Sequence, residues 1–263
     1  MIDYAEKTVL VTGGASGIGL ALGKAFRARG ARVILADINA ALVVEAADQI
    51  GARSITCDLG SPDGASGLVD AAVALDGRLD FIASNAGSSY RKRLLKADLN
   101  DPALQRLFEI NLFAAIRLAQ AYLAVLDARG QSGGMLITGS ENSLSVPSAV
   151  KGFGLGLYAI TKHGVLVAAE WLREELAATG KALSLHVLLP GGVYTPMISG
   201  NLSPDPADWP EAMAIIPPDR CAEIALAGID AELFYIPTHK HLADDMLSRS
   251  TGVATAIKLL GLG

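Results

Sequence analysis

A tyrosine and a lysine four residues apart, Tyr158 and Lys162, are the pair in this sequence best suited to proton transfer. They open a segment of helical periodicity that runs to about Ala178, and residues four apart lie on one face of a helix. A nearby ammonium favours a phenolate and lowers the pKa of the phenol from its usual ~10. A shift of ~2 pH units needs about 2.7 kcal/mol. We therefore expect a general acid or base that works near neutral pH, although such a pair on a helix usually just covers a surface.

A glycine turn near the start of the chain predicts a dinucleotide site. The β-branched run Thr8–Thr12 leads into Gly13-Gly-Ala-Ser-Gly-Ile-Gly19, a helix follows through Arg29, and a second strand, Arg32–Ala36, ends at Asp37. Glycines in this context, with an acid about 20 residues further on, are typical of dinucleotide binding. They let backbone N–H groups and a helix N-terminus approach a pyrophosphate.

The acid after the second strand predicts which nicotinamide cofactor is used. Asp37 would accept hydrogen bonds from the adenosine ribose hydroxyls, and its charge would repel a 2′-phosphate. No Arg or Lys lies in the glycine turn or directly after Asp37 to hold such a phosphate. We therefore expect NAD rather than NADP. The alternative is that Asp37 caps the helix that starts near Asn39.

Polar residues follow the next strands as well. Asp58, after the strand Ser54–Cys57, is placed to bond the adenine amino group, or it is only a turn residue. The strand Leu79–Ser84 delivers Asn85-Ala86-Gly87, small residues suited to close contact with a ribose.

A long helix predicted from Asp101-Pro102 to Arg129 carries Asn111 in its apolar stripe. A buried Asn needs hydrogen-bond partners, so it is either a structural link or part of a proton path. The strand Met135–Thr138 delivers Ser140, and the strand Ser184–Leu189 ends in Pro190-Gly191.

The alternation of strands and helices predicts the fold class α/β, a doubly wound parallel sheet of about seven strands with helices on both faces. We expect a single NAD-binding catalytic domain over residues 1–263. Its last strand lies near Leu233–Ile236, before a helical segment that follows residue 239. The aperiodic, Pro-rich stretch 197–218 is interpreted as a substrate lid lined by Trp209 and Met213.

Composition excludes several classes of partner. A formal charge of −5 argues against nucleic acid and acidic membranes, and Cys57 and Cys221 are too few for a disulfide framework. The N-terminus does not read as a secretory signal, and the apolar run Leu112–Leu126 is too short to span a bilayer. We expect a soluble cytoplasmic protein.

Two charged clusters remain open. Arg91-Lys92-Arg93 is either a solvated loop or an attractor for an acidic substrate. His239 and His241 alternate as metal ligands do, but no third ligand lies near in the sequence, which favours a surface role.

Taken together, these motifs resemble the short-chain dehydrogenase/reductase family, in its shorter single-domain branch. The matching residues are Thr12–Gly19, Asp37, Asp58, Asn85-Ala86-Gly87, Asn111, Ser140, Tyr158-x-x-x-Lys162 and Pro190-Gly191-x-x-x-Thr195, in the family's order.

The resemblance implies a role for each catalytic residue. Tyr158 is the proton donor or acceptor, Ser140 bonds the substrate oxygen, Lys162 lowers the tyrosine pKa and bonds the nicotinamide ribose, and Asn111 holds a water. The implied cofactor-binding set is Gly13, Ser16, Gly17, Ile18, Gly19, Asp37, Ile38, Asp58, Leu59, Asn85, Ala86, Gly87, Tyr158, Lys162, Pro190, Gly191, Val193 and Thr195.

The sequence departs from the family pattern in two places. The interval from Ser140 to Tyr158 is longer than usual, with Ser145–Leu155 as an apparent insertion, so Ser143 and Ser145 are rival candidates for the catalytic serine. The chain past Phe234 also lacks the family's frequent glycine-rich ending, which puts modes of subunit association that use it in doubt.

The expected activity is hydride transfer between NAD(H) and a lipophilic or aromatic secondary alcohol or ketone. A homodimer or homotetramer is expected from the apolar character of several sides of the Tyr158 helix, at Val165, Leu166, Val167 and Trp171. The alternatives are an NADP-dependent 3-oxoacyl thioester reductase and a non-catalytic NAD-sensing module. The expected substrate-contacting residues are Ser140, Asn142, Leu144, Phe153, Tyr194, Met197, Trp209 and Met213.

Overall fold

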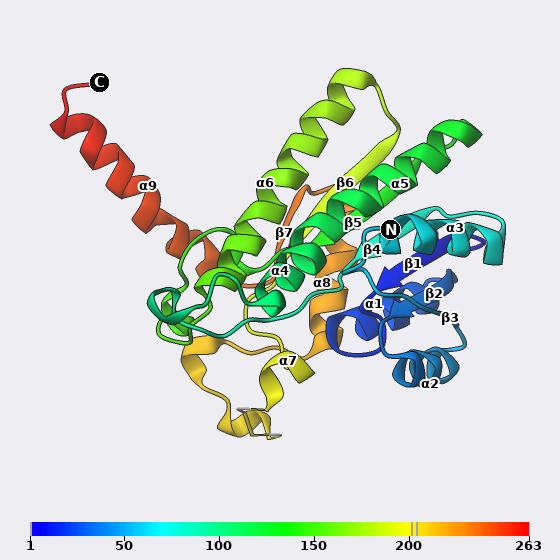
Figure 1. Cartoon of the computed structure of the whole chain (residues 1–263), viewed down its shortest axis with the longest axis horizontal. Coiled ribbons are helices and arrows are strands. Elements are labelled where there is room, and N and C mark those ends of the chain that lie inside the picture. The colour runs from blue at the N-terminus through cyan, green and yellow to red at the C-terminus, as the bar shows by residue number, and fades with distance from the viewer. Residues whose placement is uncertain (1, 201, 204, 263) are drawn as a thin grey trace.

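Seven parallel strands form one sheet at the centre of the molecule (Figure 1). The computed structural model describes residues 2–200, 202–203 and 205–262. The strand order is β3-β2-β1-β4-β5-β6-β7, which confirms the predicted doubly wound fold. The strands are β1 Thr8–Thr12, β2 Arg32–Asp37, β3 Arg53–Thr56, β4 Phe81–Ser84, β5 Gly133–Thr138, β6 Leu183–Leu189 and β7 Tyr235–Pro237.

Helices cover both faces of the sheet because alternate side chains of each buried strand point to opposite faces. Leu10 and Ile34 share one core cluster with α3, α5 and α6, whereas Val9 and Leu35 share the other with α1, α2 and α8. The helices are α1 Gly17–Ala28, α2 Ala40–Ile50, α3 Gly64–Asp76, α4 Pro102–Phe108, α5 Ala114–Arg129, α6 Gly156–Thr179, α7 Pro196–Ser199, α8 Pro218–Asp230 and α9 His241–Leu259.

The predicted long helix is present from Pro102 to Arg129, but it is not uniform. Asp101 caps it by accepting a hydrogen bond from the backbone N–H of Ala103 at 2.9 Å, and a π-helical turn, Glu109–Phe113, joins α4 to α5. By length and hydropathy residues 102–129 would qualify as a membrane-crossing helix, so the shorter run considered in the sequence understates it. Tyr122 and other side chains of α5 nevertheless pack in the core against the sheet, which explains the apolar composition.

Two outward surfaces carry apolar side chains. Val165 and Leu166 of α6 are buried in the core, which corrects their expected place on a second face, while Val167 and Trp171 are exposed, Trp171 to 65%. The helix α9 extends away from the body toward the C-terminus (Figure 1). In the described part of this helix, Leu242 alone is buried.

Candidate active site

A cavity of about 480 Å³ opens at the carboxyl ends of the central strands. The sheet order reverses between β1 and β4, and ligands of open parallel sheets collect at such a switch point. A second hollow shares Gly13, Asp37, Ala86 and Gly87 with this cavity and continues toward β3. Every residue of the predicted cofactor set except Gly19 lines one hollow or the other.

The glycines of the turn are required by close backbone contacts. Gly13 has φ +63°, and a Cβ there would lie 2.9 Å from the Cα of Ala86. A Cβ on Gly19 would lie 2.0 Å from the carbonyl oxygen of Gly13. Gly19 therefore lets α1 pack against the turn rather than lining the site.

The start of α1 fits a pyrophosphate. Its cap residue Ser16 makes no side-chain hydrogen bond to the helix, and the first turn contains no acidic residue. Backbone N–H groups and the positive end of the helix dipole are thus left facing the cavity beside Gly17 and Ile18.

The carboxylate of Asp37 is fixed by the backbone on two sides. One oxygen accepts from the N–H of Ala15 at 3.2 Å and the other from the N–H of Asn39 at 3.1 Å. The side chain of Asn39 itself caps α2, accepting from the N–H of Leu42 at 3.1 Å. Asp37 is therefore not the cap, and it lies where the two hollows meet.

Asp58 makes a turn contact and also lies at the second hollow. It lines the second hollow, and one oxygen accepts hydrogen bonds from the N–H of Gly60 and from Arg106, each at 2.8 Å. The Arg106 guanidinium holds the pKa of this carboxyl below its usual range. No local pattern in the sequence distinguished Arg106 from other helical arginines.

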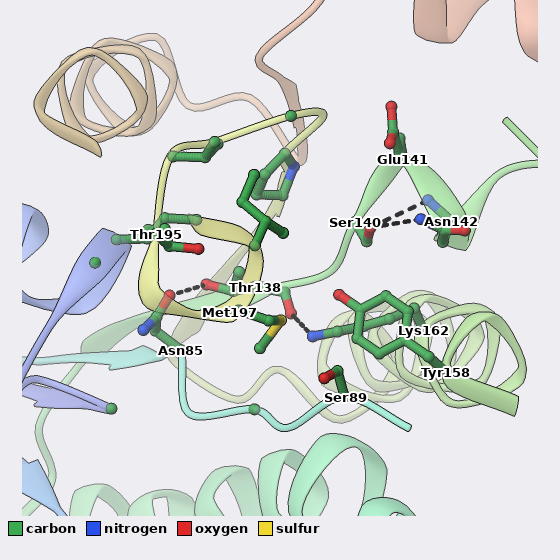
Figure 2. Close-up of a pocket in the computed structure, with 18 of the residues that line it drawn as sticks. Asn85, Ser89, Thr138, Ser140, Glu141, Asn142, Tyr158, Lys162, Thr195 and Met197 are labelled. Atoms are coloured by element: carbon green, nitrogen blue, oxygen red, sulfur yellow. Dashed lines mark hydrogen bonds between the residues drawn. The ribbon is translucent and has the colours of Figure 1, made fainter. Parts of the chain in front are cut away.

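Tyr158 and Lys162 lie one turn apart on α6 and both face the cavity (Figure 2). The ammonium of Lys162 is 5.8 Å from the centre of the tyrosine ring. It is 4% exposed and donates a hydrogen bond to the carbonyl oxygen of Thr138 at 2.8 Å. β5 and α6 together therefore fix the position of this cation.

The pKa of Tyr158 differs from the sequence-based expectation. Removal from solvent raises it to about 12 and outweighs a hydrogen bond from the Ser140 side chain, while the charge of Glu141 raises it further. Burial also lowers the pKa of Lys162 to about 8. Without bound ligands, then, loss of hydration is the main determinant of both pKa values. The lysine does not bring the pKa of the phenol below its usual value.

Ser140 is the serine that faces Tyr158. It directly follows β5, lines the cavity, and its oxygen accepts from the N–H of Asn142 at 3.1 Å. The Ser143 oxygen instead accepts from the N–H of Ser140 at 3.1 Å and closes the short 3₁₀ turn Glu141–Ser143. Ser143 and Ser145 are buried outside the cavity lining.

Asn111 lies in the π-helical turn and bonds two other segments of the chain. Its amide oxygen accepts from the N–H of Ser88 at 2.8 Å, and its nitrogen donates to the Ser88 carbonyl at 3.0 Å and to Thr161 at 3.1 Å. Asn111 thereby links the loop after β4 to α6 at Thr161, three residues after Tyr158. A π-turn often marks a functional position.

Comparisons with known proteins agree with this geometry. The family profile for short chain dehydrogenases matches residues 7–205. The chain belongs to the short-chain dehydrogenase/reductase family. It is an oxidoreductase of that family.

Several relatives of this chain are dehydrogenases by their names. It is 34% identical over 237 residues to 1-deoxy-11-beta-hydroxypentalenate dehydrogenase of Streptomyces exfoliatus, covering 88% of this chain and 82% of the relative. It is 33% identical over 192 residues to secoisolariciresinol dehydrogenase of Forsythia intermedia, covering 72% and 66%.

Solved structures share the fold. A short chain dehydrogenase/reductase from Burkholderia phymatum in complex with NAD superimposes with a TM-score of 0.84 at 20% identity, covering 97% of each chain. A short-chain dehydrogenase from Sphingobium yanoikuyae in complex with NADPH gives 0.72 at 25% identity, covering 97% of this chain and 94% of the other.

The substrate end of the dehydrogenase's cavity differs in part from the sequence-based set. Asn142, Met197 and Met213 line it together with Ser140. Leu144 instead packs against the core, and Phe153 is 52% exposed. Tyr194 and Trp209 also lie outside the lining because their rings stack on each other with centres 4.8 Å apart.

Ser89, Glu141 and Ile198 also line the substrate end and were not predicted from the sequence. Arg91 of the basic cluster lines it too, as do Val150 and Leu155 of the insertion Ser145–Leu155. Arg91 donates to the carbonyl oxygen of Met197 at 2.9 Å, whereas Lys92 pairs with Asp101 at 3.4 Å. The basic cluster is thus divided, with only Arg91 lining the cavity. The position of Glu141 in the sequence, directly after the predicted catalytic serine Ser140, could have indicated that it lies at the site.

The two histidines join loops around the cavity. His239 bonds the carbonyl oxygen of Ala214 at 2.7 Å, and His241 bonds Glu141 at 2.9 Å. Over the described residues, no cluster of three or more His, Cys, Asp or Glu side chains could hold a metal ion.

Proposed function

We propose that this dehydrogenase transfers a hydride between NAD(H) and a lipophilic secondary alcohol or ketone, with Tyr158 as the acid/base. The observation that carries the proposal is one continuous pair of hollows. The glycine turn and Asp37 lie at one end, and Ser140, Tyr158 and Lys162 lie at the other.

The site's residues divide the work of alcohol oxidation. Ser140 donates a hydrogen bond to the substrate oxygen, and Tyr158 takes the hydroxyl proton. The bound nicotinamide cofactor supplies the hydride acceptor, which the protein itself lacks. Thr195 and the backbone of Val193 would hold the carboxamide of that cofactor, and Lys162 its ribose. In reduction the proton returns from Tyr158 to the carbonyl oxygen.

The fixed carboxylate of Asp37 supports NAD over NADP, because a 2′-phosphate beside it would be repelled. The substrate end supports a lipophilic substrate, since Val150, Leu155, Ile198, Met197 and Met213 line it. The named relatives include a dehydrogenase of 1-deoxy-11-beta-hydroxypentalenate, a hydroxylated compound by its name, which supports an alcohol as substrate.

We also propose that segment 197–218 acts as a lid, that the chain forms a homodimer or homotetramer, and that it works in the cytoplasm. Met197 and Met213 at the cavity support the first of these, and the exposed apolar side chains of α6 and α9 support the second. The free thiols Cys57 and Cys221 are consistent with a reducing compartment.

The test is a panel of secondary alcohols and ketones, each offered with NAD(H) and NADP(H) and followed at the reduced-nicotinamide absorbance band. We expect turnover of lipophilic secondary alcohols with NAD. Tyr158→Phe should lower kcat by roughly a hundredfold to ten-thousandfold while NAD still binds, because only the proton-transfer group is removed.

Other outcomes of the panel would replace this proposal. Retained turnover in the Tyr158→Phe variant would contradict the assigned mechanism. Reduction of 3-oxoacyl thioesters with NADPH, and of nothing else, would favour a thioester reductase that uses Arg91 for an acidic substrate. NAD binding without turnover of any compound would favour a sensing module.

A further inference from the structure

A buried carboxylate lies in the wall of the cavity, directly after the catalytic serine. Glu141 is 7% exposed and lines the cavity beside Ser140 and Tyr158. Burying a carboxylate is costly unless it is paired. Its partner is the Nε2 of His241 at 2.9 Å, from the first residue of α9 and a hundred positions along the chain.

The proposed mechanism gives this carboxylate no task, and its charge works against the reaction. Tyr158 must become a phenolate to accept the alcohol proton, and the negative charge of Glu141 raises the pKa of that phenol. Two like charges close together in a site with little water disfavour ionisation of the second group.

The imidazole counteracts this effect. Figure 2 shows the Glu141 side chain turned away from the Tyr158 ring. Burial raises the pKa of Glu141, and the hydrogen bond from His241 opposes part of that rise, which favours the carboxylate form. A carboxylate that accepts such a bond presents less negative potential to its other neighbours.

We propose that His241 is a positioning residue of the active site, which acts through Glu141 on the Tyr158 hydroxyl. Its ring N–H holds the carboxylate on the α9 side of the cavity and offsets its charge toward the phenol. This inference rests on the proposed function, in which Tyr158 is the acid/base.

The other charged groups around the pair are few in the described structure. Asp245, on α9, faces Glu141 and raises its pKa. The ring of His239 lies 5.3 Å from that of His241, centre to centre. Because a carbonyl only accepts, His239 donates from Nε2 to Ala214, and burial lowers its pKa. His239 is therefore neutral near pH 7 and adds no cation. Lys162 is directed to the carbonyl of Thr138.

The experiment compares the pH dependence of kcat/KM for alcohol oxidation with NAD in four forms of the full chain: wild type, Glu141→Gln, His241→Leu and the double variant. Rate rises with pH as Tyr158 loses its proton. Glu141→Gln should move this rise to lower pH by roughly one unit, because a nearby unit charge is removed. His241→Leu should move it to higher pH by a similar amount, about a tenfold loss of rate on the rising limb.

The double variant decides whether the histidine acts through the carboxylate. We expect its profile to match that of Glu141→Gln alone, since His241 has nothing to offset once the charge is gone. His241→Gln, which keeps an N–H donor, should restore most of the wild-type profile. The control is His163→Leu, which removes a 2.9 Å contact between α6 and Arg249 of α9 but no carboxylate partner, and should leave the profile unchanged.

An equal shift from His241→Leu in both backgrounds, or an unmoved profile in Glu141→Gln, would overturn the proposal. If Glu141→Gln does not fold, the contrast between His241→Leu and His241→Gln still decides, because identical profiles would contradict it. Tyrosine labelled with ¹³C at the ring carbon bearing the hydroxyl, with Tyr158→Phe to assign the signal, reads ionisation of the phenol by NMR without turnover. Absence of activity in every form would therefore count against the proposed function, while the NMR shifts would still test the pair.

Discussion

The catalytic tyrosine shows how burial competes with charge at a single residue. An i, i+4 lysine was expected to make Tyr158 acidic, but the pKa of the phenol is raised to about 12 and that of Lys162 is lowered to about 8. The ammonium donates its hydrogen bond to the Thr138 carbonyl and lies over the Tyr158 ring, 5.8 Å from the ring centre. Sequence spacing identifies such a pair, but the pKa depends on hydration that only the folded cavity defines.

Cofactor choice is the prediction that belongs to one side chain. Asp37→Ala should narrow the preference for NAD over NADP by roughly tenfold or more, because about 1.4 kcal/mol of repulsion against a 2′-phosphate corresponds to tenfold. The ratio of kcat/KM values for the two cofactors measures it, with Asp48→Ala, an exposed acid at the far end of α2, as the control. An unchanged ratio would refute the ribose assignment.

The sequence correctly predicted individual site residues where a motif specified their position along the chain. Gly13 and Gly17 of the glycine turn line the two hollows, as do Asp37, Asn85, Tyr158 and Lys162. Arg106 and the Glu141–His241 pair were not found, because they depend on contacts between distant segments. Tyr194 and Trp209 were wrongly predicted to line the cavity. The stacking contact between their rings joins two separate segments and is not visible in the sequence.

At the scale of elements, a short 3₁₀ turn decides which serine serves the reaction. Ser140→Ala should lower kcat by roughly a hundredfold to a thousandfold, as expected for loss of a donor to the reacting oxygen. Ser143→Ala should instead cost about 1 kcal/mol of unfolding free energy, because its oxygen caps the turn. Steady-state kinetics and thermal unfolding of both variants separate the two effects, and a larger kinetic loss in Ser143→Ala would show that the serine is wrongly assigned.

Element boundaries followed hydrophobic pattern and capping chemistry closely. The predicted limits of β1, Thr8–Thr12, are those observed, and the other central strands agree within two residues. The π-turn at Asn111 was not predicted, because a phase shift of one residue is hard to distinguish within a largely apolar segment. In the folded chain Asn111 contacts Ser88 and Thr161 from this turn.

At the scale of the whole molecule, the outward apolar surfaces of α6 and α9 predict self-association. Trp171 and the α9 side chains Met246, Leu247, Val253 and Ile257 are exposed, and a lone extended helix gains most of its stability by packing. Val253→Glu should shift a dimer or tetramer toward smaller species in sedimentation equilibrium. Leu99→Glu, in the loop before α4, is the matched control, because Leu99 is also an exposed apolar side chain. A monomeric wild-type protein would contradict the prediction.

The cavity is lined by residues that follow β1, β2, β4, β5 and β6, and the histidines beyond β7 bond two of the segments around it. No continuous fragment of the polypeptide therefore carries a complete reaction centre. Two inactive pieces, separated at the exposed turn around Gly77, would each hold one half: the first with the nucleotide cradle, the second with the proton-transfer groups. If mixing the two pieces restored turnover, the activity would show that β1 and β4 had paired again in the middle of the sheet. The enzyme's own activity could therefore serve to report fragment complementation.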